Sequence, residues 1–412
     1  MSLSVLFATP AHTETGKVDI RLLLGCAILV LMVSMGVRHT FGLFMAPMTQ
    51  DLGWGREAFA FAIGLQNLVW GLAQPVAGGL GDRYGAHRVL VAGAIFYALG
   101  LMGMAWSTTP LLLSLSAGGL IGIAHACTTF SIMFGVMGRR LAPEQRSSAM
   151  GIVSAAGSFG QFLMLPVAQQ MIFGFGWLET LLAFAGLVLL ILPLSRGLRE
   201  APAEHGAGAA SAREAVREAV RDRSFLLLTL GYFVCGFQVV FIGVHLPAYL
   251  KDMNLPLAVA PTALALIGLF NIVGCYASGQ LGNHLPLRLV LASIYSLRSV
   301  VVTLFVLLPL SAASVYVFAA VMGVLWLSTV PPTNAILARR FGVRHLSLLS
   351  GLTFLSHQIG SFLGVWLGGL LYDRLGSYDL LWQGIIVLGV VATLLHLPID
   401  ERELSPTAAR SA

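Results

Sequence analysis

The chain has 412 residues and a formal net charge of +6, yet only 10% of its residues are charged and 57% are hydrophobic. A soluble domain carries roughly 25% charged residues, so a chain with a mean hydropathy of +0.85 lacks the polar surface to fold in water and is predicted to be an integral membrane protein. The basic residues are scattered over short loops, which excludes a nucleic-acid-binding face.

A bilayer-spanning helix needs about 20 mostly apolar residues, and the sequence contains twelve such runs. They are separated by joints of Gly, Pro, Asp and Arg, as helix ends should be. The runs are Arg21–Pro47, Glu57–Leu80, Arg88–Ser107, Pro110–Gly138, Ser148–Phe173, Trp177–Leu194, Phe225–Leu250, Leu257–Leu281, Leu287–Leu308, Ala312–Leu337, Leu346–Tyr372 and Tyr378–Pro398. The pattern predicts an all-α membrane protein with twelve transmembrane helices.

The distribution of Lys and Arg predicts the orientation. Nearly all of these residues in the joints and tails fall on the side of both termini, and only Arg56, Lys251 and Arg374 fall on the other side. Basic residues in short loops stay in the cytoplasm, so both termini are expected to be cytoplasmic. The Arg-over-Lys, Ala-rich composition favours a bacterial inner membrane.

The first run contains a charge where the membrane makes charge costly. Arg38 and His39 lie inside it, and an arginine at the centre of a spanning helix costs on the order of 2.5–3.5 kcal/mol. None of the 18 Asp and Glu residues lies mid-span to neutralise Arg38. A guanidinium matches a carboxylate bidentately, so Arg38 is the leading candidate for binding an anion. The alternative is that it bonds backbone carbonyls or water.

A glycine-rich turn closes the second run, with the sequence Gly78-Gly79-Leu80-Gly81-Asp82-Arg83-Tyr84-Gly85-Ala86-His87-Arg88. Glycines permit a tight turn, and Asp82 can pair with basic groups or cap a helix. We expect a gating latch here, made by Gly78, Asp82, Arg83, Gly85 and Arg88. A second copy near Gly279 carries Asn283 in place of Asp82.

Histidine changes charge near neutral pH and is the plausible proton carrier where carboxylates are absent. His39, His125 and His357 fall inside runs and are candidates for substrate binding or proton transfer, with interhelical hydrogen bonding as the alternative. His245 and His396 lie close to helix ends and are expected at the membrane interface.

The segment Arg196–Arg223 is the one sizeable soluble piece. Its part Ala201–Ala212 is rich in Ala, Gly and Pro and is predicted to be a linker. The part Arg213–Arg221 has Glu and Arg three residues apart and is predicted to form a short helix. We expect it to lie in solvent or against headgroups, with a regulatory docking site as the alternative.

The chain repeats itself with an offset of 200 residues. Gly36 matches Gly236, Arg139-Arg140 matches Arg339-Arg340, and Gly151 matches Gly351. The repeat predicts two parallel six-helix halves of the kind found in rocking transporters. The predicted parts are an N-terminal tail (1–20), a first bundle (21–196), a linker (197–223), a second bundle (224–398) and a C-terminal tail (399–412).

The second half adds its own polar residues inside runs. Gln238 stands where the repeat would place a partner of Arg38, and Asn271 and Asn334 are further candidate cavity hydrogen bonders. Arg298, in the ninth run, is the second intramembrane charge. It is expected either to contact substrate or a coupling ion, or to make structural hydrogen bonds. Pro331-Pro332 is predicted to interrupt the tenth run.

The turn at Gly78–Arg88, the twelve runs and the two halves resemble the major facilitator superfamily over nearly the whole chain. The resemblance implies an alternating-access transporter in which the first, fourth, seventh and tenth helices line the central path. The stretches Thr40–Phe44 and Asp51–Arg56 resemble the monocarboxylate transporter group, which includes oxalate/formate exchangers. Animal members carry an Asp and an Arg four apart on the eighth helix, where this chain has Asn271 and Cys275.

These features predict a secondary transporter of a small organic anion, a monocarboxylate, driven by proton symport or by exchange. An exporter of drugs or hydrophobic metabolites is the alternative, and a sensor that no longer transports is a third hypothesis. No catalytic motif or nucleotide loop is present, so the chain is not expected to be an enzyme or an ATP-driven pump. The four cysteines show no CxxC spacing. No metal or cofactor is expected, and a monomer in the lipid bilayer is predicted.

Overall fold

The computed structural model describes residues 20–141, 143–199, 209–342 and 346–403. The predicted N-terminal tail, most of the Ala-rich linker and the end of the C-terminal tail lie outside these residues. The first half contains α1 (Ile20–His39), α2 (Phe41–Leu52), α3 (Arg56–Tyr84), α4 (Ala86–Ala105), α5 (Pro110–Leu113), a π-helical turn η2 (Ser114–Leu120), α6 (Ile121–Thr128), α7 (Phe130–Arg140), α8 (Pro143–Phe175), α9 (Trp177–Val188), α10 (Ile191–Leu194) and a 3₁₀ turn η3 (Ser195–Leu198).

The short helix α11 (Ala209–Ala219) precedes the second half. The second half contains α12 (Arg223–Asp252), α13 (Val259–Leu281), α14 (Leu287–Leu307), α15 (Ala312–Leu325), α16 (Val330–Phe341), α17 (Leu346–Leu375) and α18 (Asp379–His396). The described residues form helices and no strands, which confirms the all-α prediction.

Eleven helical segments are long and apolar enough to cross a membrane. The helix α3 is a twelfth long helix of 29 residues that packs among them. Its lower hydropathy reflects the polar side chains Gln66, Asn67 and Gln74. The arrangement agrees with the twelve predicted spans.

Three spans are interrupted near their middles. The first breaks at Thr40, the fourth at Thr129, and the tenth over residues 326–329. The helices α7 and α16 begin 200 residues apart, as the repeat requires. The break in the tenth span precedes the prolines, because Pro331 and Pro332 occupy the first turn of α16. A proline is tolerated there since that turn has no intrahelical acceptor for its missing N–H.

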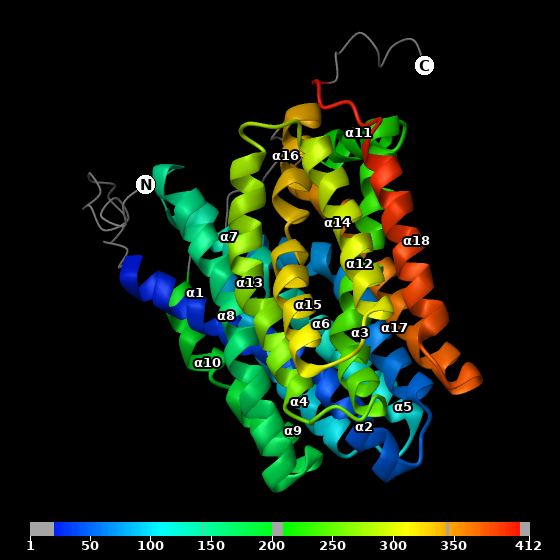
Figure 1. Ribbon diagram of the computed structural model, residues 1–412. Helices are drawn as coiled ribbons and strands as arrows, with labels where there is room; N and C mark the ends of the chain where they lie inside the picture. Colours follow the sequence, from blue (N-terminus) through cyan, green and yellow to red (C-terminus); the bar gives the residue numbers. More distant parts are fainter. Residues whose placement is uncertain (1–19, 142, 200–208, 343–345, 404–412) are drawn as a thin grey trace.

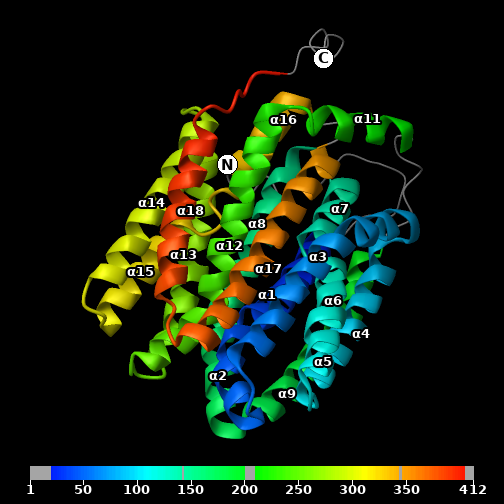
Figure 2. The same cartoon turned by 90° about the vertical axis from the view of Figure 1, so that its right-hand side faces the viewer.

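The helices form two groups that stand side by side (Figure 2) and overlap in the view of Figure 1. We call α1–α10 the first group and α12–α18 the second group. Within the first group α1 packs on α8, and within the second group α12 packs on α17. The groups meet through α3 against α17, α8 against α13, and α2 against α12. We call this contact surface the seam; α3 and α17 run along each other in both ribbon views (Figure 2).

Glycines allow the paired helices inside each group to touch backbone to backbone. A Cβ on Gly160 of α8 would meet the carbonyl of Met32 in α1, and a Cβ on Gly360 of α17 would meet the carbonyl of Phe233 in α12. Close approach through small residues is the usual way that membrane helices pack. The same contact therefore recurs in both halves at the 200-residue offset.

The short helix α11 lies at one end of the molecule, together with the ends of α7 and α16 (Figure 1). We call this end the linker face, and the other end, which carries the turn between α2 and α3, the opposite face. The predicted linker helix is confirmed and begins at Ala209. Ala219 is buried in an apolar cluster with Phe225 and Leu349, so α11 is fastened to the second group.

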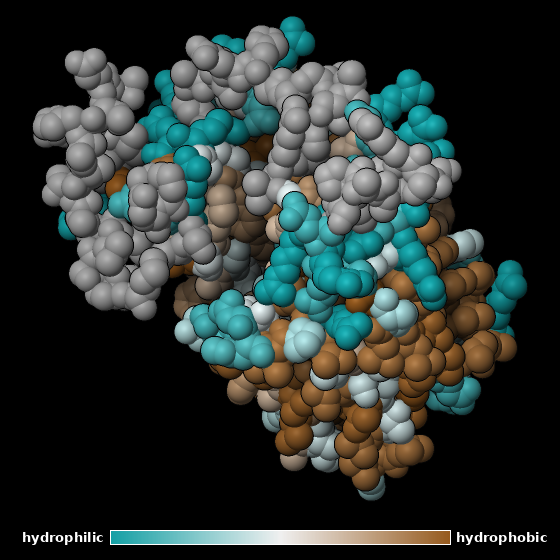
Figure 3. Space-filling view, turned by 90° about the horizontal axis from the view of Figure 1, so that it is seen from above, coloured by the Kyte–Doolittle hydropathy of each residue, from teal (hydrophilic) through white to brown (hydrophobic). Residues whose placement is uncertain are grey.

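The seam is closed at the opposite face and open toward the linker face. Between described side chains, the hydrogen bonds that cross it run from Lys251–Gln50, near the opposite face, to Gln358–Asn67, midway along α3 and α17. Seen from the linker face, the space-filling surface is hollowed between the groups (Figure 3). These hydrogen bonds join the groups at the opposite face, where a cavity of about 300 Å³ remains between α2, α8, α12 and α13.

Candidate functional site

Arg38 lies on the last turn of α1, directly before the break at Thr40, and is half-buried. Its Nη2 donates to Oδ1 of Asn67 at 2.9 Å, and its Nη1 lies 3.4 Å from Nε2 of His39. The Asn67 amide in turn donates to the carbonyl of Ile63, which fixes the amide so that its oxygen faces Arg38. The Nε of Arg38 has no partner among the described residues.

An aromatic ring lies beside the guanidinium. The centre of the Arg38 guanidinium is 4.8 Å from the ring of Trp70, a cation–π contact. The indole N–H donates to Gln74, which holds the ring in place. The other contacts of Trp70 are His125, at 5.4 Å between ring centroids, and Phe354 of α17, at 5.2 Å.

The second group supplies the facing wall. The amide of Gln358 donates to the backbone carbonyl of Asn67 across the seam. His357 is buried, with its Nδ1 3.0 Å from Oε1 of Gln358 and its ring 4.9 Å from that of Tyr232. We call Arg38, His39, Asn67, Trp70, Phe354, His357 and Gln358 the central cluster. It lies midway along α3 and α17, where Gln358 and Asn67 join the two groups.

Among the described residues, no Asp or Glu forms an ion pair with Arg38. The ion pairs that the structure shows, such as Arg56–Asp252 and Arg340–Asp222, lie at the two faces. A guanidinium with a free Nε, one amide partner and no counter-ion attracts an anion. The central cluster can therefore bind a carboxylate with no protein charge to displace.

His125 lies behind Trp70, away from the seam. It is fully buried between the rings of Trp70 and Tyr97, and neither of its ring nitrogens has a hydrogen-bond partner among the described residues. The structure brings it within ring contact of the central cluster without placing it beside Arg38. Its substrate role stays a prediction.

Arg298 and Gln238 lie in a second cluster, inside the second group. Arg298 is fully buried, and its Nε donates to the carbonyl of Leu325 at 3.0 Å. Its Nη2 donates to the carbonyls of Leu325 and Trp326, and its Nη1 to Oε1 of Gln238 at 3.3 Å. Arg298 thus caps the broken end of α15, the arrangement expected of the structural alternative. The structure does not bring Arg298 together with Arg38.

The side-chain amides of Asn271 and Asn334 also make structural hydrogen bonds. Asn271 accepts from the backbone N–H of Leu327 at 2.9 Å and donates to Ser158 of α8 across the seam at 2.9 Å. Asn334 is half-buried and accepts from Ser350 at 2.6 Å. Cys275, the other position at which the monocarboxylate pattern has a charge, donates weakly to Asn271.

The glycine-rich turn joins α3 to α4 at the linker face. Gly85 has a φ of 84°, which only glycine adopts easily, and its N–H donates to the carbonyl of Gly81. Asp82 pairs with Arg139 of α7 at 2.5 Å, within the first group. A Cβ added at Gly78 would meet no close neighbour, and the side chains of Arg83 and Arg88 are exposed. In the second group Arg339, the repeat partner of Arg139, donates to the carbonyl of Gly282 instead.

Sequence reasoning missed several residues of this arrangement. Trp70 and Phe354 look like ordinary lipid- or core-facing aromatics, and only the fold brings them to Arg38. Among the charges at the opposite face, Arg56 entered the sequence analysis only as a loop residue, and Asp252 and Asp373 were not singled out. The predictions for His245 and His396 were wrong, because both are buried inside the protein rather than exposed at the interface; α17 covers His245.

Comparison with known proteins gives one family. Residues 26–364 match the sequence model of the Major Facilitator Superfamily. The uncharacterized MFS-type transporter YcxA of Bacillus subtilis is 24% identical over 89% of this chain and 92% of its own length. Monocarboxylate transporter 13 of Bos taurus is 26% identical over 88% of this chain and 85% of its own length. Monocarboxylate transporter 11 of Mus musculus is 25% identical over 84% of this chain and 80% of its own length.

Proposed function

Because this chain belongs to the major facilitator superfamily, we propose that it carries a small organic anion, a monocarboxylate, across the membrane by alternating access. The observation that carries the proposal is Arg38, half-buried beside Asn67 midway along α3 and without a carboxylate partner among the described residues. The names of two relatives, monocarboxylate transporters 13 and 11, support the same class of solute.

The central cluster gives each neighbour of Arg38 a role in this proposal. The carboxylate accepts from the terminal nitrogens of Arg38, while the hydrogen bond to Asn67 holds the guanidinium in one orientation. Trp70 covers one face of the guanidinium and keeps water from it. The organic part of the solute lies against Phe354 of the second group, so both groups contact the solute.

Rocking of the groups moves the opening from one face to the other. In the present conformation the solute exchanges with the linker face, which the distribution of basic residues predicts to be cytoplasmic. Closing that side requires the linker-face ends of α3 and α8 to approach those of α17 and α13. The energy comes from a proton moved with the anion or from exchange against a second anion.

Uptake into proteoliposomes tests the proposal. Purified protein is reconstituted, and uptake of labelled carboxylates of two to eight carbons is measured with and without a pH gradient. Arg38→Ala removes a charge-assisted hydrogen bond worth about 1.5–3 kcal/mol, so anion uptake at low substrate falls about 10- to 100-fold. Arg38→Lys keeps the charge, loses the bidentate fork and gives an intermediate rate.

The matched control is Arg217→Ala, which removes an exposed arginine on α11 and leaves uptake unchanged. Undiminished anion uptake by Arg38→Ala would contradict the proposal. Uptake of hydrophobic cations with no anion uptake would favour the drug-exporter alternative instead.

A further inference from the structure

A buried histidine lies beside the closed part of the seam. His245, near the opposite-face end of α12, has no exposed surface. Its Nε2 is 2.8 Å from the backbone carbonyl of Val365 in α17, and its Nδ1 is 3.1 Å from the hydroxyl of Tyr378. The ring stacks on Phe241, and Gly368 of α17 leaves no space for a Cβ beside it. The imidazole is therefore held in one orientation.

The partners determine where its proton lies. The Val365 carbonyl can only accept, so Nε2 carries a hydrogen. Arg56 of α3 donates from Nη1 to the Tyr378 oxygen at 2.9 Å, and a guanidinium cannot accept. The hydroxyl hydrogen of Tyr378 is thus free to point at Nδ1. A phenol keeps its hydrogen near neutral pH, so the closed seam holds a neutral His245 with Nδ1 as acceptor.

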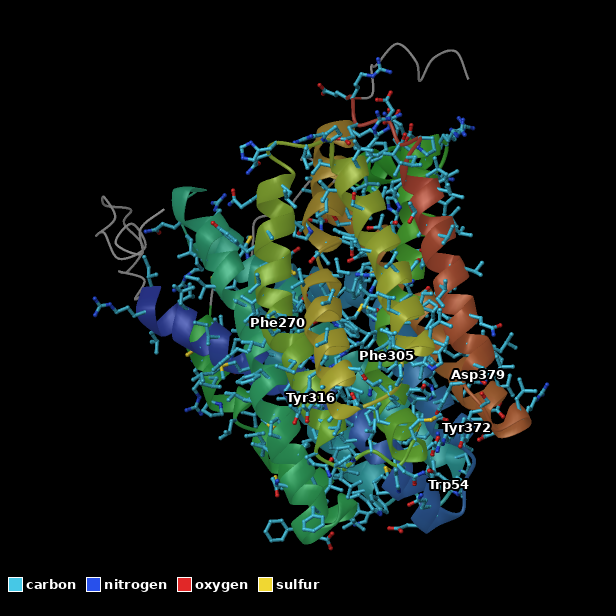
Figure 4. The ribbon with its side chains drawn as sticks, viewed as in Figure 1. Trp54, Phe270, Phe305, Tyr316, Tyr372 and Asp379 are labelled. Carbon is cyan, nitrogen blue, oxygen red and sulfur yellow. The ribbon has the colours of Figure 1, made fainter. Side chains whose placement is uncertain are left out.

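This hydrogen-bond chain is part of the contact between the groups. Arg56, from the first group, binds both carboxylate oxygens of Asp252 at 2.7 Å and lies 3.7 Å from the ring of Tyr372, both from the second group. Asp373 accepts from the backbone N–H groups of Arg56 and Glu57, so a carboxylate of α17 caps the start of α3. Trp54 and Tyr372 mark this lower end of the molecule in Figure 4.

A second proton on His245 conflicts with this arrangement. With a hydrogen on Nδ1, the ring becomes a donor to the Tyr378 oxygen, which already accepts from Arg56. The hydroxyl hydrogen of Tyr378 then loses its acceptor, and two cations face each other across one oxygen. Two cations in so small a volume with one shared acceptor repel.

The other charged and titratable groups around this point do not offset that conflict. The groups around His245 on the packed elements are Arg56 and Glu57 on α3, Tyr249, Lys251 and Asp252 on α12, Tyr372 and Asp373 on α17, and Tyr378 and Asp379 at the start of α18. Asp252 is engaged by Arg56, Asp373 by the start of α3, and Glu57 by Trp366. No carboxylate of the described residues hydrogen-bonds to His245 itself.

We propose that His245 is a protonation site that keeps the seam closed at the opposite face only while it is neutral. Acid on that face then shifts the protein toward the conformation open there. The proposal concerns the conformational equilibrium and does not depend on which solute is carried.

Distance measurement on the full chain in lipid tests this directly. Spin labels are attached at Phe175→Cys on α8 and Met253→Cys after α12, two exposed positions at the opposite face, in a chain whose four native cysteines are replaced by alanine. From about pH 8 to about pH 5 the ratio of the long-distance to the short-distance population is expected to rise about tenfold. Because one proton is involved, the logarithm of this ratio should change by at most about one per pH unit.

Three variants separate His245 from other titrating groups. His245→Gln can donate and accept like the neutral ring but cannot titrate, so the short distance persists at all pH values. His245→Arg, whose guanidinium stays charged at all these pH values, gives the long distance throughout. Tyr378→Phe removes the donor to Nδ1 and reduces the acid response, which provides a second readout if His245 variants fold poorly.

The control is His396→Gln, which changes a buried histidine of α18 that bonds its own helix at Ala392 and retains the full acid response. The inference is overturned if the native chain shows no acid shift, or if His245→Gln shifts as the native chain does. Loss of anion uptake with an intact acid shift would count against the proposed function alone.

Discussion

Arg38 and Arg298 carry the same guanidinium in opposite circumstances. Arg298 has no exposed surface, and three of its nitrogens donate to Leu325, Trp326 and Gln238. Arg38 is half-buried, keeps its Nε unpartnered among the described residues and faces the open side of the seam. A buried cation whose nitrogens are all satisfied stabilises the fold, whereas the buried Nε of Arg38 still lacks a partner that an anion could supply.

Replacement of Arg298 is expected to damage the fold rather than substrate binding alone. Arg298→Ala leaves the carbonyls at the end of α15 without donors, and each buried unpaired acceptor costs about 1–3 kcal/mol. Thermal unfolding in detergent should show a clear loss of stability. Arg38→Ala is the control and should unfold close to the native chain; equal stability of both variants would contradict the capping role.

At the scale of the helices, the repeat is visible in contacts as well as in sequence. Ser34 of α1 hydrogen-bonds to Thr128 at the break of the fourth span, and Cys235 of α12 lies 3.3 Å from Thr329 at the break of the tenth. Both broken spans are thus tied to the corresponding helix of their own half. The breaks leave backbone groups that side chains must satisfy, and Asn271 and Arg298 do so in the second half.

The close helix pairs predict which glycines cannot change. Gly160→Ala and Gly360→Ala would each drive a Cβ into a facing backbone carbonyl, and overpacking of this kind costs about 1–3 kcal/mol. Thermal stability in detergent should fall for both.

The matched controls are Gly151→Ala and Gly351→Ala, on the same two helices. A Cβ at either position meets nothing within 4 Å, so the helix gains up to about 1 kcal/mol from the better propensity of alanine. If the two pairs of variants behave alike, backbone contact does not set the packing of these helices.

For the molecule as a whole, the seam decides the conformation. Closure at the opposite face combines the ion pair Arg56–Asp252, the cap from Asp373 and the hydrogen bond Lys251–Gln50, all between the two groups. These contacts are exposed or half-buried ion pairs and hydrogen bonds, each worth little by itself. A seam held by several weak contacts can open and close within one transport cycle.

Cross-linking the groups at the opposite face should stop transport. In Gln50→Cys with Lys251→Cys, a short reducible bifunctional thiol reagent joins the two groups, and uptake is expected to fall to background until the linker is reduced. The control pair is Asp51→Cys with Trp177→Cys, whose native side chains meet at 2.6 Å inside the first group. Uptake that survives the first cross-link would argue against rocking about this seam.

Composition and periodicity determined much of this protein by themselves. Run length sets the number of spans, because a helix must satisfy its backbone within the bilayer and needs a fixed length to cross it. The 200-residue offset predicted two parallel six-helix halves, and Pro331-Pro332 predicted the interruption of the tenth run. The inventory of acidic residues singled out Arg38, since a charge without a partner can be recognised by counting.

Tertiary structure decided which polar groups meet. Nothing local distinguishes Arg298 from Arg38, or brings Trp70 and Phe354 to the guanidinium. Asp252 and Arg56 are 196 residues apart in sequence, and the burial of His245 depends on α17 lying over it. These relations depend on which helix faces meet and on how the two groups are rocked, and neither is encoded in the periodicity of a single helix.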